Sequence, residues 1–257
     1  MIGIFDSGSG GLTVLQAIRA QAPQADILYL GDIANMPYGQ RDAKDLERLT
    51  FAMMRLLRTR GATTLVSACN SISASVIRPM FELLGIRDAG VIEMVGPAMR
   101  AVVGRAFRRI VVLATPATAA SGLYQRGGEE AGLDVQVVTS PTLAALVERG
   151  EEGEALQSEI ERLVKATVVL LPDAVILGCT HYPFVRERLE ESLARQGCRA
   201  SVLDPAPAVA LEAVMHHGIR GTGKIEILIT AESAPFRSRV AGFCGLPEAT
   251  IQLIEAF

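Results

Sequence analysis

Short apolar segments alternate with longer amphipathic segments along most of the chain, and this alternation restricts the fold more than any other feature. The short apolar runs predict buried strands at 2–5, 27–30, 64–68, 110–114, 135–138 and 175–177. Apolar residues at helical spacing predict helices at 12–20, 43–60, 73–84, 119–131, 154–169 and 185–195. Strands that alternate with helices in this way favour an α/β fold with parallel sheets, whose chemistry lies at the carboxyl ends of the strands.

Two pairs of similar segments predict an internal duplication. Asp6 and Thr115 each follow an apolar strand and lie 109 residues apart, while Cys69 and Cys179 do the same at 110 residues. Nearly equal offsets favour two related α/β halves, although chance likeness between buried strands is the alternative. We expect one half to comprise residues 1–96 plus 206–257 and the other residues 97–205. The two cysteines would then occupy matching places and face each other across a cleft.

The composition indicates a globular protein without an electrostatic preference for polyanions. Of the 257 residues 49% are hydrophobic and 21% charged, and the net charge is -3. Bulk attraction to nucleic acid or an anionic membrane is therefore not expected, and neither is a membrane span or a secretory leader. We expect a cytoplasmic protein whose four cysteines stay reduced. The cysteines form no CxxC pair and the three histidines have no matching spacing, so no structural metal site is expected.

The segment 6–13, Asp-Ser-Gly-Ser-Gly-Gly-Leu-Thr, combines a strand end, three glycines and a helix start. Such a loop favours an anion at its backbone amides. No Gly-Lys-Ser/Thr follows, and Thr13 interrupts the Rossmann pattern, so a carboxylate fits better than a diphosphate and a nucleotide binder is disfavoured. Asp6 itself is expected to assist a general base or to pair with an ammonium group. The alternative is a tight glycine turn in which Asp6 caps the helix.

Two cysteines follow apolar strands, in Cys69-Asn70-Ser71 and in Cys179-Thr180-His181. A helix N-terminus after Cys69 is expected to lower the pKa of its thiol. A histidine two residues after Cys179 is placed to draw or relay its proton. Each cysteine could instead be an inert buried residue and His181 a loop histidine, and a Cys/His hydrolase would leave Cys69 without a role.

A pair of opposed thiols suits racemisation at an α-carbon. One group removes a proton from one face while its partner returns a proton to the other face, and the roles swap in reverse. Because an amino-acid α-proton is very weakly acidic, the developing negative charge also needs hydrogen-bond donors. Ser7, Asn70, Ser71 and Thr180 are placed to supply some of them.

These motifs together resemble the glutamate racemase family of the aspartate/glutamate racemase superfamily. The matching segments are Ile4–Gly8, Gly10–Val14, Tyr29–Asp32, Pro37–Gly39, Ala68–Asn70 and Leu177–Pro183. The resemblance implies two pseudo-symmetric flavodoxin-like domains with the active site in the cleft between them, and neither a cofactor nor a metal. It further implies a bacterial cytoplasmic homodimer that supplies D-glutamate for peptidoglycan.

The resemblance also implies roles for particular residues. Cys69 and Cys179 would transfer the protons, and Asp6 and His181 would assist them. Substrate would be bound by Asp6, Ser7, Pro37, Tyr38, Gly39, Asn70, Ser71, Thr115, Thr118, Glu148, Thr180 and His181.

The chain departs from the family pattern at a few positions. Ser71 and Ile72 stand where the family usually has Thr and Ala, and Ser140-Pro141 stands where Cys-Pro is expected. We expect the bulkier Ile72 to crowd the cleft or to change the packing beside Cys69. Two alternatives follow: a superfamily racemase or isomerase acting on aspartate or another amino acid, and a non-catalytic carboxylate-binding homologue.

Overall fold

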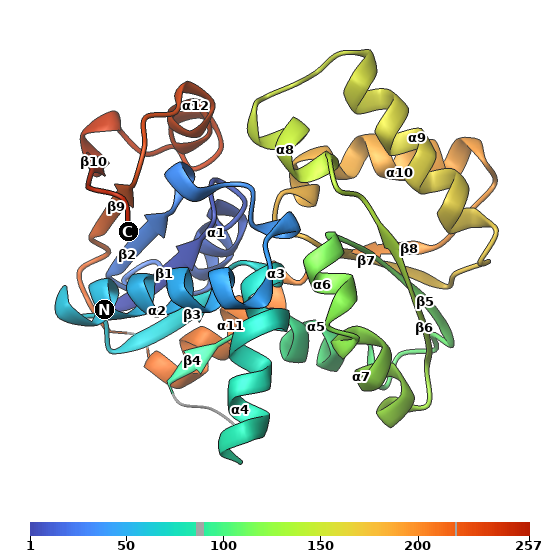
Figure 1. Cartoon of the computed structure of the whole chain (residues 1–257), viewed down its shortest axis with the longest axis horizontal. Helices are drawn as coiled ribbons and strands as arrows, with labels where there is room; N and C mark the ends of the chain where they lie inside the picture. Colours follow the sequence, from blue (N-terminus) through green and yellow to red (C-terminus); the bar gives the residue numbers. More distant parts are fainter. Residues whose placement is uncertain (86–89, 219) are drawn as a thin grey trace.

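The computed structural model describes residues 1–85, 90–218 and 220–257, and these form two parallel β-sheets flanked by helices (Figure 1). The first sheet has six strands in the order β10-β9-β2-β1-β3-β4, and the second has four in the order β6-β5-β7-β8. The strands are β1 (Ile2–Asp6), β2 (Ile27–Gly31), β3 (Thr64–Ser67), β4 (Val91–Ile92), β5 (Arg109–Ala114), β6 (Asp134–Thr139), β7 (Ala174–Gly178), β8 (Ser201–Leu203), β9 (Ile225–Ile229) and β10 (Ile251–Leu253). Parallel sheets in an α/β fold were predicted, and the structure confirms them.

Helices follow most of the strands and cover the sheets. They are α1 (Leu12–Gln21), α2 (Ala43–Thr59), α3 (Asn70–Ile72), α4 (Arg78–Leu84), α5 (Val95–Val102), α6 (Pro116–Ala120), α7 (Leu123–Ala131), α8 (Leu143–Glu148), α9 (Glu154–Val168), α10 (Arg186–Arg195), α11 (Ala206–His217) and α12 (Ala234–Gly242). Short 3₁₀ turns span Ile33–Asn35, Tyr38–Gln40, Tyr182–Val185 and Glu248–Thr250, and a π-helical turn spans Ser73–Ile77. No helix in the described part is long and apolar enough to cross a bilayer.

The two sheets repeat one arrangement of strands. In the first, β2, β1, β3 and β4 are successive neighbours, and in the second β6, β5, β7 and β8 are. Asp6 therefore ends the strand that corresponds to β5, which precedes Thr115, and Cys69 and Cys179 follow the corresponding strands β3 and β7. The strand order supports the duplication that the spacing of these residues predicted.

The C-terminal segment returns to the first sheet. β9 pairs with β2, and β10 pairs with β9, so residues 225–253 extend the sheet that residues 2–92 began. Residues 109–203 supply all strands of the second sheet. The expected division into 1–96 plus 206–257 and 97–205 is compatible with this arrangement, and its boundaries stay a prediction.

Two predicted helices are wrong in detail. The helix expected at 119–131 is two helices, α6 and α7, because Gly122 adopts a left-handed conformation (φ 66°) between them. The helix expected at 73–84 begins earlier, at Asn70, and passes through the π-helical turn before α4. Its first turn therefore lies directly after Cys69.

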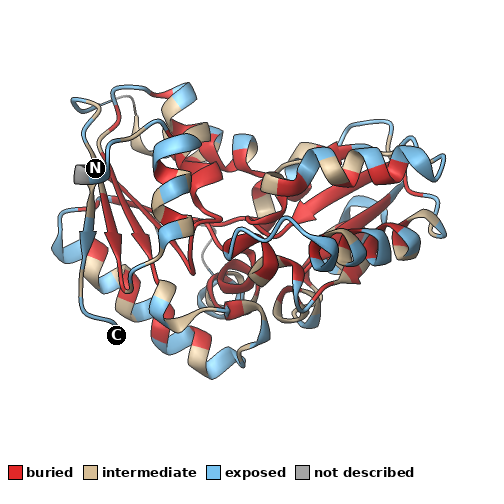
Figure 2. Cartoon of the chain, turned by 90° about the horizontal axis from the view of Figure 1, so that it is seen from above, coloured by how far each residue is buried: buried red, intermediate tan, exposed pale blue. Residues whose placement is uncertain are grey.

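Burial on both faces of each sheet explains why the strands are apolar throughout. All five residues of β1 are buried, as are all five of β7 (Figure 2). Helix α2 shows the complementary pattern, because Leu46, Leu49 and Met53 lie on its buried face. Polar side chains that are also buried stand out against this background, and many of them lie at the carboxyl ends of the strands.

Candidate active site

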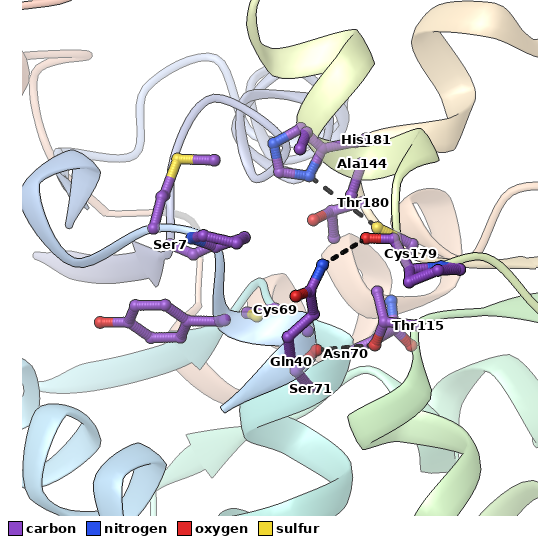
Figure 3. Close-up of a pocket in the computed structure, with 16 residues that line it drawn as sticks. Ser7, Gln40, Cys69, Asn70, Ser71, Thr115, Ala144, Cys179, Thr180 and His181 are labelled. Carbon is purple, nitrogen blue, oxygen red and sulfur yellow. Dashed lines mark hydrogen bonds between the residues drawn. The ribbon is translucent and has the colours of Figure 1, made fainter. Parts of the chain in front are cut away.

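A pocket lies between the carboxyl ends of the two sheets (Figure 3). It is narrow in this conformation, with about 30 Å³ of space that water can occupy. Its lining comprises Ser7, Met36, Pro37, Tyr38, Gly39, Gln40, Cys69, Asn70, Ser71, Thr115, Pro141, Ala144, Ala145, Cys179, Thr180 and His181. Loops from both sheets thus contribute to one cavity, as expected for a site at the strand ends of an α/β fold.

Cys69 and Cys179 both line this pocket, and they reach it from the loops of different sheets (Figure 3). Each follows the end of a buried strand, β3 or β7, and each is 5% exposed. The strand order gives them corresponding positions in the two halves of the fold.

The environment of Cys179 contains a positive charge. Its Sγ lies 3.9 Å from Nδ1 of His181, whose Nε2 lies 2.8 Å from a carboxylate oxygen of Glu148. Burial opposes the charge of His181, but the hydrogen bonds with Cys179 and Glu148 outweigh it and raise the imidazole pKa to about 10. The imidazolium form therefore predominates at neutral pH and places a positive charge beside Cys179.

Glu148 is an ionised partner for this imidazole. Burial raises its pKa, but the hydrogen bond and charge of His181 and the hydroxyl of Ser9 outweigh burial, and the net pKa lies below its usual value. The backbone amide of Ser9 also donates to Glu148, at 3.1 Å, and the Ser9 hydroxyl donates to the same oxygen. Glu148 therefore links the glycine-rich loop after β1 to the histidine after β7.

Cys69 lies beside a carboxyl group, whereas Cys179 lies beside a cation. Burial raises the pKa of its thiol well above the usual value, and the charge of Asp6 adds to that effect. The amides of Ser71 and Ile72 act in the opposite direction without overcoming burial. The expectation that the helix start lowers this pKa is therefore wrong, because burial and the carboxyl group of Asp6 outweigh the amides at the start of the helix.

The surroundings of Asp6 bear on both alternatives that the sequence left open. Its Oδ2 accepts the amide hydrogen of Gly11 at 2.5 Å at the start of α1, as in the helix-capping alternative. Burial also raises the pKa of the carboxyl from 3.8 to about 6, although the charge of His181 lowers it. Asp6 is fully buried beneath the pocket and can exchange a proton near neutral pH.

Hydrogen-bond donors converge on the cavity from both sheets. The side-chain Oδ1 of Asn70 accepts a bond from the hydroxyl of Tyr124 at 2.8 Å, which leaves Nδ2 buried without a partner in the described part of the chain. Ser71 Oγ and Thr115 Oγ1 are 2.9 Å apart (Figure 3). Thr118 continues this chain of hydroxyls, with its Oγ1 3.1 Å from that of Thr115. A buried unpaired amide donor is costly unless a ligand accepts its hydrogen bond.

The glycines of the segment 6–13 serve close packing more than anion binding. A Cβ on Gly10 would lie 2.4 Å from Thr180 Oγ1 and 2.7 Å from His181 Nδ1. A Cβ on Gly8 would lie 3.0 Å from Glu148 Oε1. These glycines let the loop of the first sheet approach the site residues of the second, and only Ser7 of that loop lines the pocket.

The structure brings most of the predicted site residues together. Pro37, Tyr38 and Gly39 form one wall, where Gly39 packs against Thr115 and the hydroxyl of Tyr38 donates to Asp32. Three predicted residues, Asp6, Thr118 and Glu148, are outside the lining and contact the residues that form it.

The departures from the family pattern have ordinary structural roles. Ile72 is fully buried in the apolar cluster beneath the first sheet's site loops and is absent from the pocket lining, so it does not crowd the cleft. Ser140 accepts hydrogen bonds from the amides of Thr142 and Leu143 at the start of α8. Pro141 lines the pocket, and its carbonyl accepts a bond from Gln40 Nε2 at 2.7 Å.

Several contributors were missed by the sequence analysis. Gln40 lies next to the matched segment Pro37–Gly39, and this proximity was the available signal for it. Tyr124 orients Asn70 from α7, a contact that sequence spacing could not indicate. No cluster of three or more His, Cys, Asp or Glu residues among those described has the geometry to hold a metal ion.

Comparison with known proteins agrees with this geometry. The sequence model of the family described as Asp/Glu/Hydantoin racemase matches residues 10–213. The chain belongs to this family. The resemblance that the motifs indicated is thus confirmed, and the chain is an amino-acid racemase by family.

Individual relatives match over nearly the whole chain. A glutamate racemase from Aquifex pyrophilus is 36% identical over 233 residues, which cover 89% of this chain and 88% of that protein. The crystal structure of a glutamate racemase isoform from Bacillus anthracis superposes with a TM-score of 0.84 at 28% identity, covering 99% of this chain and 97% of that one. A glutamate racemase from Thermus thermophilus, solved in complex with β-chloro-D-alanine, gives a TM-score of 0.78 at 31% identity, covering 99% and 96%.

Proposed function

We propose that this racemase interconverts L- and D-glutamate by a two-base mechanism in which Cys69 and Cys179 act on opposite faces of the α-carbon. One observation carries the proposal: two buried thiols line the same small pocket in environments of opposite electrostatic sign. The imidazolium of His181 places a positive charge beside Cys179, while burial and Asp6 favour a protonated thiol on Cys69. We therefore assign the base to Cys179 and the acid to Cys69 for one direction of the reaction.

The proton transfers follow from these charge states. The Cys179 thiolate takes the α-proton from one face, and the C–H electron pair passes into the α-carboxylate as an enediolate. The Cys69 S–H bond then gives its proton to the opposite face of the carbon. The site is left with a thiol at Cys179 and a thiolate at Cys69, which is the state required for the opposite enantiomer. Asp6, with a pKa near 6, is placed to return a proton towards Cys69.

The enediolate needs stabilisation at its oxygens. The unpartnered Nδ2 of Asn70 is a buried donor in the pocket, and the hydroxyls of Ser71, Thr115 and Thr180 line the same cavity. Donors that are already oriented in a water-poor site cost little reorganisation when negative charge develops. We assign these groups to the substrate carboxylates.

Glutamate is the substrate that the comparisons favour. Relatives that are 34–37% identical over three quarters or more of this chain are named glutamate racemases. By the same resemblance, we propose that the enzyme supplies D-glutamate for peptidoglycan in a bacterial cytoplasm and acts as a homodimer.

The test is deuterium exchange at the α-carbon in D₂O. Wild-type protein is expected to exchange and racemise both L- and D-glutamate, with slower or no reaction on aspartate. Cys69→Ala and Cys179→Ala are each expected to abolish racemisation and keep the fold by circular dichroism. In each variant the remaining thiol still faces one side of the α-carbon, so exchange should persist for one enantiomer only, and the two variants should select opposite enantiomers.

Cys198→Ala is the matched control, because Cys198 is half-buried in the apolar cluster of the second sheet and outside the pocket. It should leave both activities unchanged. Racemisation that survives in either active-site variant would overturn the two-base assignment. Faster exchange of aspartate than of glutamate would replace the substrate, and ligand-induced stabilisation without any exchange would indicate a binding protein.

A further inference from the structure

Arg239 is a partly buried cation whose contacts lead into the site, although it lies outside the pocket lining. It belongs to α12, which follows β9 of the first sheet, whereas its partners include the end of α8, attached to the second sheet. Figure 1 shows α12 and α8 at the same end of the molecule. The side chain of Arg239 is only 15% exposed, so its contacts are shielded from solvent.

The guanidinium of Arg239 makes three kinds of contact with this region. It donates to the backbone carbonyl of Glu148 at 3.0 Å and to that of Val147, and these carbonyls lie at the C-terminal end of α8. A cation is favourable there because the final carbonyls of a helix lack partners within the helix. It also lies 3.7 Å from the Glu148 carboxylate, and its guanidinium carbon is 5.0 Å from the centre of the Phe184 ring.

Ser9 connects the same two groups. Its hydroxyl accepts a hydrogen bond from Arg239 at 2.9 Å and donates its own hydrogen to Glu148. The Glu148 oxygen that receives it is the one that contacts His181 Nε2. A chain of contacts therefore runs from Arg239 through Ser9 and Glu148 to His181, whose other nitrogen faces Cys179.

We propose that Arg239 is a positioning residue for catalysis: it fixes the Glu148 carboxylate on His181 and thereby maintains the imidazolium that faces Cys179. Arg239 itself touches neither the pocket nor the reacting atoms. Its positive charge favours the ionised form of Glu148, and ionised Glu148 favours protonated His181. The titratable groups that face His181 are Asp6, Glu148 and Cys179. Removal of Arg239 weakens the contribution of Glu148, whose ionised form Arg239 favours.

This inference rests on the proposed role of Cys179 as a base, and the test separates the two. Arg239→Gln removes the charge and retains a hydrogen-bonding side chain. The protonation of His181 is followed directly by NMR of the isotope-labelled imidazole as pH is varied, without reference to activity. We expect the pKa of His181 to fall from about 10 by about one unit or more. At about pH 10, where this fall deprotonates most of the imidazole, kcat for glutamate should fall about fivefold or more, with a smaller change in KM.

Two further variants test whether the effect of Arg239 depends on its charge and on its position. Arg239→Lys keeps the charge and should recover most of the shift in His181 pKa and part of the loss in kcat. Arg237→Gln is the matched control, because Arg237 lies on the same helix and pairs with Glu232 on the surface at 2.8 Å. It should leave both the His181 titration and kcat unchanged.

The outcomes are distinct. A fall in kcat with an unchanged His181 titration would overturn the proposal, because Arg239 would then be only a structural clamp between α12 and α8. An unchanged kcat and titration would also overturn it. If Arg239→Gln does not fold, Arg239→Met removes the same charge and keeps an apolar chain beside Phe184, and an unaltered His181 titration in that variant has the same meaning. Absence of glutamate racemisation in the wild type would instead count against the proposed function, while the titration would still test the link from Arg239 to His181.

Discussion

Replacing Asp6 with asparagine should stabilise the protein at neutral pH while it impairs racemisation. Asp6 is fully buried, and burial raises the pKa of its carboxyl from 3.8 to about 6. At neutral pH the folded protein therefore holds a carboxylate where a neutral group would be more stable. Asparagine has nearly the same shape, carries no charge and can still accept the hydrogen bond from Gly11.

The size of the effect follows from proton linkage. The unfolded chain releases the Asp6 proton near pH 3.8, whereas the folded protein retains it up to about pH 6. The folded state binds more protons in this interval, so Asp6 contributes stability that is complete below the lower value and is lost as pH rises through the upper one. A shift of about two units at about 1.36 kcal/mol each corresponds to about 3 kcal/mol.

The assay compares the two proteins across this interval. Urea unfolding, followed by circular dichroism from about pH 4 to about pH 7, gives the free energy of unfolding of each. The difference between variant and wild type cancels the titration of other groups, and it should move by about 3 kcal/mol in favour of Asp6→Asn as pH rises. At the upper end of the range, racemisation by the variant should fall about a hundredfold or more if Asp6 relays protons for Cys69.

A control with the opposite sign is available at Asp173. Its carboxylate accepts the backbone amides of Arg108 and Arg109, both at 2.8 Å, and these bonds lower its pKa. Asp173→Asn should therefore lose stability relative to the wild type as pH rises. A stability difference for Asp6→Asn that is flat with pH, or that follows the sign of Asp173→Asn, would refute the assignment of a raised pKa to Asp6.

Two further predictions concern the contacts around His181. Glu148→Gln should lower the pKa of His181 from about 10 by about two units and reduce kcat about tenfold or more, because the ionised partner is lost. NMR titration measures the first effect, and a His181 pKa that stays near 10 would contradict it. Gly10→Ala should reduce kcat about a hundredfold, since its Cβ would lie 2.7 Å from His181 Nδ1, whereas Gly153→Ala should not, since a Cβ there meets nothing within 4 Å. Equal rates for the two alanine variants, measured by polarimetry, would rule out close packing as the reason for Gly10.

The sequence predicted the first two thirds of the fold well and the last part poorly. Strands such as β1 and β7 are buried on both faces, so their composition is apolar throughout and easily recognised. β4 has two residues and lies at an edge, and β10 has exposed positions, so neither carries such a signal. α12 also lacked a clear apolar face, and the residue that it carries towards the site was missed with it.

Local patterns also explain which site residues were identified. A cysteine after an apolar strand indicated its place at the carboxyl edge of a sheet, and two such cysteines indicated their common pocket. Nothing in the local sequence of Arg239 or Tyr124 distinguishes it from other surface or core residues. Their roles depend on partners that lie 54 or more residues away in the chain.

The sequence by itself determined the parallel α/β architecture and which two cysteines line the pocket. Both follow from short-range patterns: apolar runs that form buried strands, and a cysteine directly after the end of such a strand. Only the tertiary structure decided the electrostatic character of each thiol. Burial and the charge of Asp6 reversed the direction of the pKa shift that the helix start predicted for Cys69, and Glu148 maintains the charge of His181 beside Cys179. These effects act between segments that are far apart in the chain. Close packing between the two sheets likewise determined why glycine occupies position 10.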